Sequence, residues 1–290
     1  MGAGSRTATR RDRTATWGGA MDAPLGLSLL GGFELTVDGE LVHLPLGSQR
    51  LIAYLAVRQR AVSRSNVAGT LWRDSSEQHS HASLRSALWR ANKSRIRLVV
   101  ADGQNMQLDS CLSVDVHDLV TTAHRLLRQP VGGAEPAPPF ELLLHDLLPE
   151  WDDDWIVMER ERLRQLRLHA LEALAGRLTG AQRYGDAIEA GQAAVRAEPL
   201  RESSHRTLIR THLAEGNYVE ALRQFRLYAT LLRFELGLEP SAEMRSLVDD
   251  VRVVRAPRTL RLGRVRDPGV GPSDLEVGGL VRVPLAKEPS

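Results

Sequence analysis

Hydrophobic residues recur at helical spacing in three consecutive segments of the first half of the chain, residues 47–62, 63–74 and 74–94. In the third segment the apolar positions share one stripe, which consists of Leu84, Ala87, Leu88 and Ala91. An i, i+3, i+4, i+7 spacing is typical of a helix that packs one face on a core. The pattern therefore predicts three short amphipathic helices in succession.

Hydroxyl side chains near the start of each segment indicate where these helices begin. Ser48 and Ser63 are the predicted N-caps of the first two helices, because a serine oxygen can accept a hydrogen bond from a free backbone N–H. Ser75 and Gln78 have the spacing of a capping box and are predicted to open the third helix.

Alternating apolar and polar residues surround the three helices. Residues 27–46 alternate in this way around the turn signal Asp38-Gly39, and residues 97–109 read as strand, Asp102-Gly103 turn and strand. Strands, three helices and a terminal hairpin are the layout of a winged helix-turn-helix domain. In that layout the third helix enters the major groove, and the hairpin lies along the adjacent backbone or minor groove.

The third helix has an unusual outer face. Outside the apolar stripe, residues 82–93 carry Arg85, Trp89, Arg90 and Lys93 and no acidic residue. A solvated helix normally mixes both signs of charge, because pairs of opposite sign stabilise it. Guanidinium groups bind phosphate oxygens and the O6 and N7 atoms of guanine, and Ser83 and Ser86 are short enough to let the helix approach a groove. The face favours DNA binding, with a solvated basic helix as the alternative.

Charge is distributed unevenly along the chain, although the formal net charge is only +2. Residues 1–130 carry a net charge of +5, residues 131–250 of −7 and residues 251–290 of +4. A basic region beside an acidic one suggests that only the first half meets a polyanion.

The second half has the pattern of a helical repeat. A Gly/Pro-rich linker is predicted over residues 121–145, followed by a long amphipathic helix over 154–178. Then three positions recur 34 residues apart, namely Tyr184 and Tyr218, Ala187 and Ala221, and Ile188 and Leu222, with Gly180 and Gly216 just upstream. This is the tetratricopeptide period, although two unrelated helices could share the pattern. Such repeats bind peptides or proteins.

Signals for catalysis or metal binding are weak. The sequence contains no phosphate-binding glycine loop, metalloprotease motif or nucleophile elbow, and we expect neither an enzyme nor a cofactor. His79 and His81 lack further clustered ligands, so a metal site is disfavoured, and Asp152–Asp154 is interpreted as a solvated helix N-terminus. The single cysteine, Cys111, excludes an intramolecular disulfide, and no apolar run is long enough to span a bilayer.

The chain resembles the SARP family (Streptomyces antibiotic regulatory proteins), in which an OmpR-type winged helix precedes a bacterial transcriptional activation domain built of tetratricopeptide-like helices. The resemblance covers about residues 27–250. In the first half it rests on LLGGFELTVDG, LAVRQRAVSRSNVAGTLWRD and ASLRSALWR. In the second half it rests on LPEWDDDWIVMERERLRQLRLHALEALA, AEPLRESSHRTLIRTHLAEGNYVEALRQF and LLRFELGLEPS.

The resemblance implies a mainly α fold with small β-sheets. We expect a disordered extension over residues 1–24, a winged-helix domain over 25–120, an activation domain over 146–252 and a disordered tail over 253–290. It also implies a cytoplasmic, nucleoid-associated activator that binds direct repeats near the −35 region of promoters in an antibiotic biosynthetic cluster. The implied partners are double-stranded DNA, the RNA polymerase holoenzyme with its sigma factor, and a second copy of the chain on DNA, with no membrane.

The resemblance also assigns roles to individual residues. Helix 76–93 is the implied recognition element, with Arg90 as the foremost base contact and Arg85 and Lys93 beside it. Arg64 and Arg73 are implied phosphate contacts. The wing spans residues 99–108, and its tip carries Gln104 and Asn105. The full set of expected DNA-binding residues is Arg64, Arg73, Ser83, Arg85, Ser86, Trp89, Arg90, Lys93, Gln104 and Asn105.

One departure from the family pattern supports a second hypothesis. The usual Leu-Arg after the recognition arginine is Ala91-Asn92 here, which removes a cation and shortens a core side chain. The alternative function is therefore a helical-repeat adaptor for protein interactions that binds nucleic acid weakly and without specificity. The two hypotheses differ in whether a particular DNA sequence is preferred over scrambled DNA as salt rises.

Overall fold

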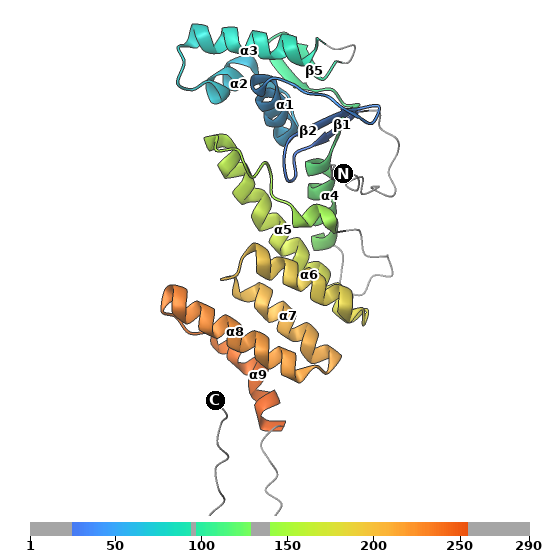
Figure 1. The fold of residues 1–290 in the computed structure, drawn as a ribbon, viewed down its shortest axis with the longest axis vertical. Coiled ribbons are helices and arrows are strands. Elements are labelled where there is room, and N and C mark those ends of the chain that lie inside the picture. Colours follow the sequence, from blue (N-terminus) through green and yellow to red (C-terminus); the bar gives the residue numbers. More distant parts are fainter. Residues whose placement is uncertain (1–24, 94–96, 129–139, 255–290) are drawn as a thin grey trace, which may run out of the picture.

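The computed structural model describes residues 25–93, 97–128 and 140–254. Within them the chain is elongated, with the strands and first three helices at one end and a stack of helices leading away from it (Figure 1). The chain is mainly α-helical with two small sheets, as the hydrophobic pattern predicts. None of the described helices is long and apolar enough to cross a membrane. The expected extension over 1–24 and the tail from residue 255 onward lie outside the described residues.

Seven short strands form two sheets in the described part of the chain. They are β1 (Leu25–Ser28), β2 (Glu34–Val37), β3 (Glu40–Leu41), β4 (Val62–Ser63), β5 (Val99–Asp102), β6 (Asn105–Leu108) and β7 (Ser113–Val114). The first sheet has the order β3-β2-β1-β7, in which β7 runs parallel to β1. The second has the order β4-β6-β5 and contains the hairpin predicted around Asp102-Gly103. Gly103 has a positive φ of 54°, which a glycine adopts without strain.

The three predicted helices are α1 (Leu46–Arg58), α2 (Arg64–Leu71) and α3 (Glu77–Ala91). The N-cap of α2 is Ser63, as predicted, and its hydroxyl accepts a hydrogen bond from the Asn66 N–H. The other two predicted caps are wrong. The cap of α3 is Ser76, whose hydroxyl accepts a hydrogen bond from the His79 N–H. Ser48 lies inside α1 and is fully buried, and its hydroxyl donates to the Ala87 carbonyl 2.9 Å away, because α3 packs against this turn.

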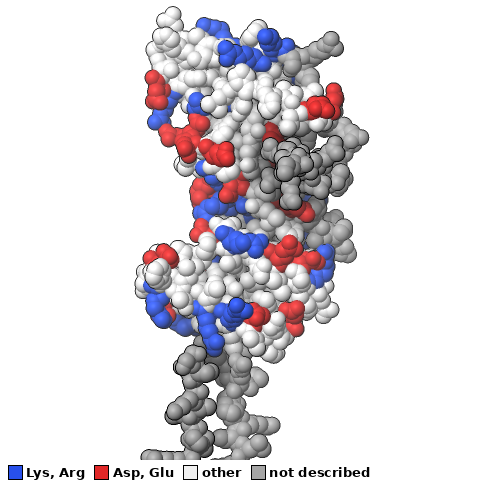
Figure 2. Space-filling model, viewed as in Figure 1, with Lys and Arg blue, Asp and Glu red and all other residues white. Residues whose placement is uncertain are grey.

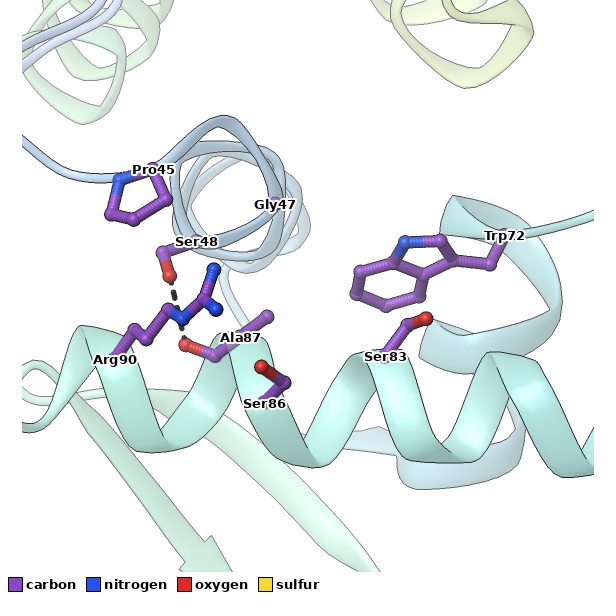
Figure 3. Close-up of a pocket in the computed structure, with 8 residues that line it drawn as sticks. All are labelled: Pro45, Gly47, Ser48, Trp72, Ser83, Ser86, Ala87 and Arg90. Carbon is purple, nitrogen blue, oxygen red and sulfur yellow. Dashed lines mark hydrogen bonds between the residues drawn. The ribbon is translucent and has the colours of Figure 1, made fainter.

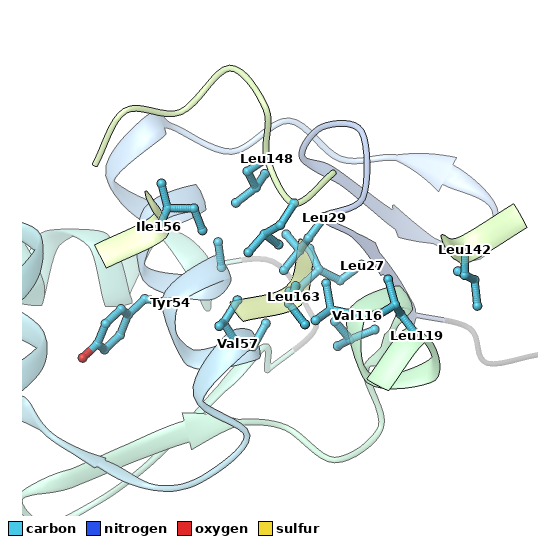
Figure 4. Close-up of a cluster of buried hydrophobic side chains, with 14 of the residues drawn as sticks. Leu27, Leu29, Tyr54, Val57, Val116, Leu119, Leu142, Leu148, Ile156 and Leu163 are labelled. Atoms are coloured by element: carbon cyan, nitrogen blue, oxygen red, sulfur yellow. The ribbon is translucent and has the colours of Figure 1, made fainter. Parts of the chain in front are cut away.

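A hydrophobic core joins the two halves of the chain through α4 (Asp115–Arg128) and α5 (Asp154–Gly180). Figure 4 shows side chains of β1, α1, α4 and α5 meeting in one cluster, and they include Leu27, Leu29, Tyr54, Val57, Val116, Leu119, Ile156 and Leu163. Burial of apolar surface stabilises such a cluster by roughly 25 cal/mol per Å². Separating the two halves would therefore expose a shared core.

Arginines of α5 hold the segment that leads into it, which contains the short helix η1 (Glu141–Leu144). Arg160 donates to the carbonyls of Leu147 and Trp151 at 2.9 and 2.7 Å. Arg167, which is buried, donates to the Leu143 carbonyl at 3.0 Å. The region expected to be a linker thus has ordered ends, since residues 121–128 complete α4 and residues 141–144 form η1. Its centre, residues 129–139, lies outside the described residues.

The helical repeat continues through α6 (Tyr184–Ala197), α7 (Glu202–Glu215), α8 (Tyr218–Leu236) and α9 (Ala242–Val254). The backbone keeps the period of 34 residues. Gln182 and Gly216 both have positive φ, at 59° and 84°, and the next residues, Arg183 and Asn217, are N-caps with nearly identical backbone angles. The counterpart of Gly216 is therefore Gln182 and not Gly180. Ala187 and Ala221 are fully buried, as expected of small residues between closely packed helices.

Candidate nucleic-acid interface

Helix α3 lies at one end of the molecule and exposes the basic face that its sequence predicts (Figure 1). Leu84, Ala87 and Ala91 are buried. Arg85 and Arg90 are exposed, and neither makes an ion pair within the described residues. The space-filling view shows Lys and Arg side chains gathered at this end of the molecule (Figure 2). The face thus presents cations to solvent. The one acidic residue of α3 is Glu77, in its first turn.

An aromatic ring lies on the same outer face. Trp89 is 61% exposed, and the Lys93 ammonium lies 4.9 Å from the centre of its ring. A cation over an indole face is stabilised by the ring quadrupole. Arg85 and Trp89 are four residues apart and so share one face of α3, whereas Lys93, expected inside the helix, lies just beyond its C-cap, Asn92.

Ser83, Ser86 and Arg90 form the neighbouring ridge of α3, and they line a hollow between this helix and the start of α1. The other walls are the Trp72 ring and the first turn of α1 at Pro45, Gly47 and Ser48 (Figure 3). The close-up shows the Arg90 guanidinium extending toward that first turn. The backbone N–H groups at a helix start attract anions, so the hollow combines an arginine, two hydroxyls and a positive helix end.

The wing tip lies on the β5–β6 turn, where Gln104 and Asn105 are exposed as predicted. Arg64 lies beside it. Its Nε donates to the Gly103 carbonyl at 3.1 Å, and its backbone N–H donates to the Gln104 carbonyl at 2.8 Å. Arg64, expected to contact phosphate, therefore also joins the start of α2 to the wing tip.

Arg73 was expected to contact a DNA phosphate, but in the structure its guanidinium pairs with a carboxylate of the same chain. It follows α2 and forms an ion pair with Asp154 at the start of α5, and both side chains are largely exposed. Two further arginines of the basic region, both on α1, are held in the same way, since Arg50 pairs with Asp153 and Arg58 with Glu159 at 3.0 Å. Asp153 and Asp154 do lie at the N-terminus of α5, as interpreted, and Asp154 is largely exposed, but both carboxylates also pair with arginines of the winged-helix region.

These ion pairs divide the basic region of residues 50–97. One group, Arg50, Arg58 and Arg73, pairs with acidic residues at the start of α5. The other group faces solvent and consists of Arg85 and Arg90 on α3 and Lys93 just after it. This division was not predicted, because the paired residues are separated by 81 to 103 positions in the chain. Only a regular spacing of Arg50 and Arg58 around Tyr54 hints that they share one side of α1.

No group of three or more histidine, cysteine or acidic side chains within the described residues could hold a metal ion. His79 accepts or donates a hydrogen bond at 2.7 Å with the Ser76 hydroxyl that caps its own helix. Cys111 is exposed, and its hydrogen bond to Asp109 raises the pKa of the thiol, which lowers its nucleophilicity at neutral pH.

Comparison with known proteins shows two likenesses, one of a domain and one of the fold. Residues 116–252 match the family described as bacterial transcriptional activator domain. The fold is similar to that of Mycobacterium tuberculosis EmbR, solved in complex with a low-affinity phosphopeptide, with a TM-score of 0.64 and 20% sequence identity over 80% of this chain. The chain spans 65% of the length of EmbR. A search of curated proteins gives no match.

The matched region begins at the start of α4, ahead of the activation-domain limit expected from the sequence. This start agrees with the packing, because α4 contributes to the core that α5 shares with the first sheet. The domain limits proposed from the sequence otherwise stay predictions. Residues 116–252 are thus similar to a bacterial transcriptional activator domain, and the fold of the chain is similar to that of EmbR.

Proposed function

We propose that the chain is a sequence-specific DNA-binding activator that reads promoter DNA with α3 and carries its helical repeat to the transcription machinery. The observation that supports this proposal best is the outer face of α3, where Arg85 and Arg90 are exposed and without acidic partners in the described structure. A helix of about 10–12 Å diameter fits the major groove, in which bidentate arginine contacts to guanine give about 1–3 kcal/mol of discrimination.

The proposal includes the finer expectations from family resemblance. The DNA sites are direct repeats near the −35 region, occupied by two copies of the chain. The helical repeat recruits the RNA polymerase holoenzyme with its sigma factor, and the target promoters belong to an antibiotic biosynthetic cluster. The protein acts without catalysis or cofactor, in the cytoplasm and on the nucleoid.

A selection experiment tests sequence specificity without knowledge of the operator. The full chain is used to enrich duplexes from a random-sequence library, and binding of the enriched duplex and a scrambled duplex is then compared across a salt series. We expect an enriched motif and an affinity ratio above about 10³ at physiological salt, the usual lower range for specific binding. Failure to enrich any motif would refute the proposal.

The Arg90→Ala variant tests which helix reads the DNA. We expect loss of preference for the enriched duplex with unchanged thermal stability, because Arg90 is exposed. The exposed Arg60, which follows α1, provides the matched Arg60→Ala control with the same loss of charge. Equal footprints for wild type and Arg90→Ala would show that another surface contacts the bases.

One observation favours the alternative hypothesis of a protein-interaction adaptor. Arg50, Arg58 and Arg73 are bound to acidic residues of α5, so fewer cations are available for DNA than the sequence suggests. An adaptor would bind enriched and scrambled duplexes equally and lose both as salt rises, because counterion release carries no sequence information.

A further inference from the structure

The residue that follows α3 forms a connection that neither the fold class nor the family match assigns. Asn92 is the C-cap of α3, and its side chain bonds to the first residues of the wing. Its Nδ2 donates to the Val99 carbonyl at 2.9 Å. Its Oδ1 accepts from the Leu98 and Val99 N–H groups, both at 3.0 Å. All three bonds lie between the end of the helix and the start of β5.

The surroundings of Asn92 make this connection rigid. Ala91, Leu98 and Val99 are almost completely buried, so the backbone on both sides of the bonds is anchored in the core. The side-chain amide offers one acceptor oxygen and one donor nitrogen, and both are used toward the same strand. The Asn92 side chain therefore hydrogen-bonds to the start of β5 as the backbone of a neighbouring strand would.

The wing is held at its opposite end as well. Arg64 bonds to the carbonyls of Gly103 and Gln104 at the tip, and β6 pairs with β4 next to the start of α2. The base of the hairpin is thus tied to α3, whereas its tip is tied to α2. The two ties fix the position of the wing relative to the helix that faces solvent.

We propose that Asn92 is a positioning residue, which sets the distance between the recognition helix and the wing so that both contact one DNA duplex. This inference rests on the proposed DNA-binding function. The departure from the family's usual arginine then has a consequence opposite to a loss of specificity. An asparagine at this position removes a cation, but its three hydrogen bonds hold the start of the wing.

Two variants and a matched control test this role. Asn92→Ala removes all three bonds. Asn92→Asp keeps an acceptor for the two N–H groups but loses the donor and places an oxygen near the Val99 carbonyl, so its effect should be intermediate. Asn217→Ala is the control, because Asn217 is exposed and its side chain caps nothing in α8.

The first measurement is hydrogen exchange of the full chain without DNA. We expect faster exchange in residues 98–108 of Asn92→Ala, with unchanged exchange in α3 and in the helical repeat. Exchange in the wing that matches wild type would overturn the inference, because the wing would then be held without Asn92. This outcome does not depend on whether the protein binds DNA specifically.

The second measurement is hydroxyl-radical footprinting on the duplex enriched by the wild-type chain. We expect Asn92→Ala to bind about tenfold more weakly, equivalent to about 1.4 kcal/mol, and to lose the protections outside the major-groove contact of α3 while keeping those of the helix. Loss of both sets of protections together, or of neither, would overturn the positioning role. If wild type enriches no duplex, the proposed function fails, and the hydrogen-exchange result still decides whether Asn92 holds the wing.

Discussion

The Tyr54 ring on α1 meets the Trp155 ring on α5 edge to face, with centroids 5.2 Å apart and planes at 85°. Both residues are buried. Ion pairs flank the two rings, with Arg50 and Asp153 on one side and Arg58 and Glu159 on the other. Edge-to-face pairs add about 0.5–1.5 kcal/mol beyond the burial of area. Helix α1 of the winged-helix region is therefore packed directly against the first turns of α5.

This packing predicts that the two halves unfold together. Trp155→Ala should lower the free energy of unfolding by about 3–5 kcal/mol, the usual cost of truncating a buried aromatic residue. We expect a single calorimetric transition for the wild type and two for Trp155→Ala, because the variant breaks the shared core. Trp89→Ala is the control, since Trp89 is 61% exposed and its loss should change stability by less than about 0.5 kcal/mol. Two transitions already present in wild type would contradict this coupling.

Asp154 competes with DNA for Arg73 if Arg73 is a phosphate contact. Because both side chains of the pair are largely exposed, the pair contributes only about 0–1 kcal/mol, and stability should barely change in Asp154→Asn. We expect this variant to bind the enriched duplex more tightly and to increase the salt slope, log Kd against log salt, by about one unit for one additional phosphate contact.

The control for this prediction is Asp186→Asn. Asp186 also forms an exposed ion pair with an arginine, Arg183, but in the helical repeat. The Asp186→Asn variant removes the same charge as Asp154→Asn, but at a position far from α3. Equal gains in affinity for the two variants would mean that overall charge, and not release of Arg73, is responsible.

The features that were predicted correctly depend on residues close together in the sequence. The stripe of Leu84, Ala87 and Ala91 and the Asp102-Gly103 turn are local patterns, and the structure contains both. The same holds for the 34-residue period, in which the structural counterpart of Gly216 is Gln182, since both have a left-handed backbone.

The features that were missed depend on tertiary partners. Ser48 has the residue type of a cap, but the Ala87 carbonyl of α3 takes its hydroxyl. Asp153 and Asp154 have the pattern of a solvated helix start, but arginines about 80 to 100 positions earlier bind them. Asn92 looked like a loss relative to the family pattern, and its bonds to β5 are visible only once the strand is placed. Local chemistry identifies such residues as polar, and only the fold identifies their partners.

The Arg90→Lys variant separates base reading from phosphate binding. A lysine keeps the positive charge but cannot make a bidentate contact to guanine. If Arg90 reads a base, the variant should lose about 1–3 kcal/mol of preference for the enriched duplex while its salt slope stays unchanged. If Arg90 instead binds a phosphate from the hollow beside Ser83 and Ser86, affinity for both duplexes should remain within about threefold of wild type. Anisotropy titrations with enriched and scrambled duplexes distinguish the two results.

The buried His205 side chain predicts that the helical repeat is sensitive to acid. Burial lowers the pKa of its imidazole below the ordinary value of 6.5. Nε2 donates to the Pro199 carbonyl, so the neutral ring accepts a hydrogen bond from Gln224 at Nδ1, both at 2.8 Å. The His205 imidazole therefore binds a proton more readily in the unfolded state than in the folded state. Its contribution to the free energy of unfolding is complete above pH 6.5 and declines as the pH falls below that value.

We therefore expect the free energy of unfolding to fall between pH 7 and pH 5, with a contribution from His205 of at most about 1.4 kcal/mol per pH unit. His205→Gln should be less stable than wild type at pH 7, because the packing of the ring on Tyr228 at 4.5 Å is lost, but it should show a flatter pH dependence. His124→Gln, a change at an exposed residue of α4, should keep the wild-type pH dependence. Urea denaturation of the three proteins at pH 7, 6 and 5 measures these slopes. Parallel curves for wild type and His205→Gln would show that the acid sensitivity arises elsewhere.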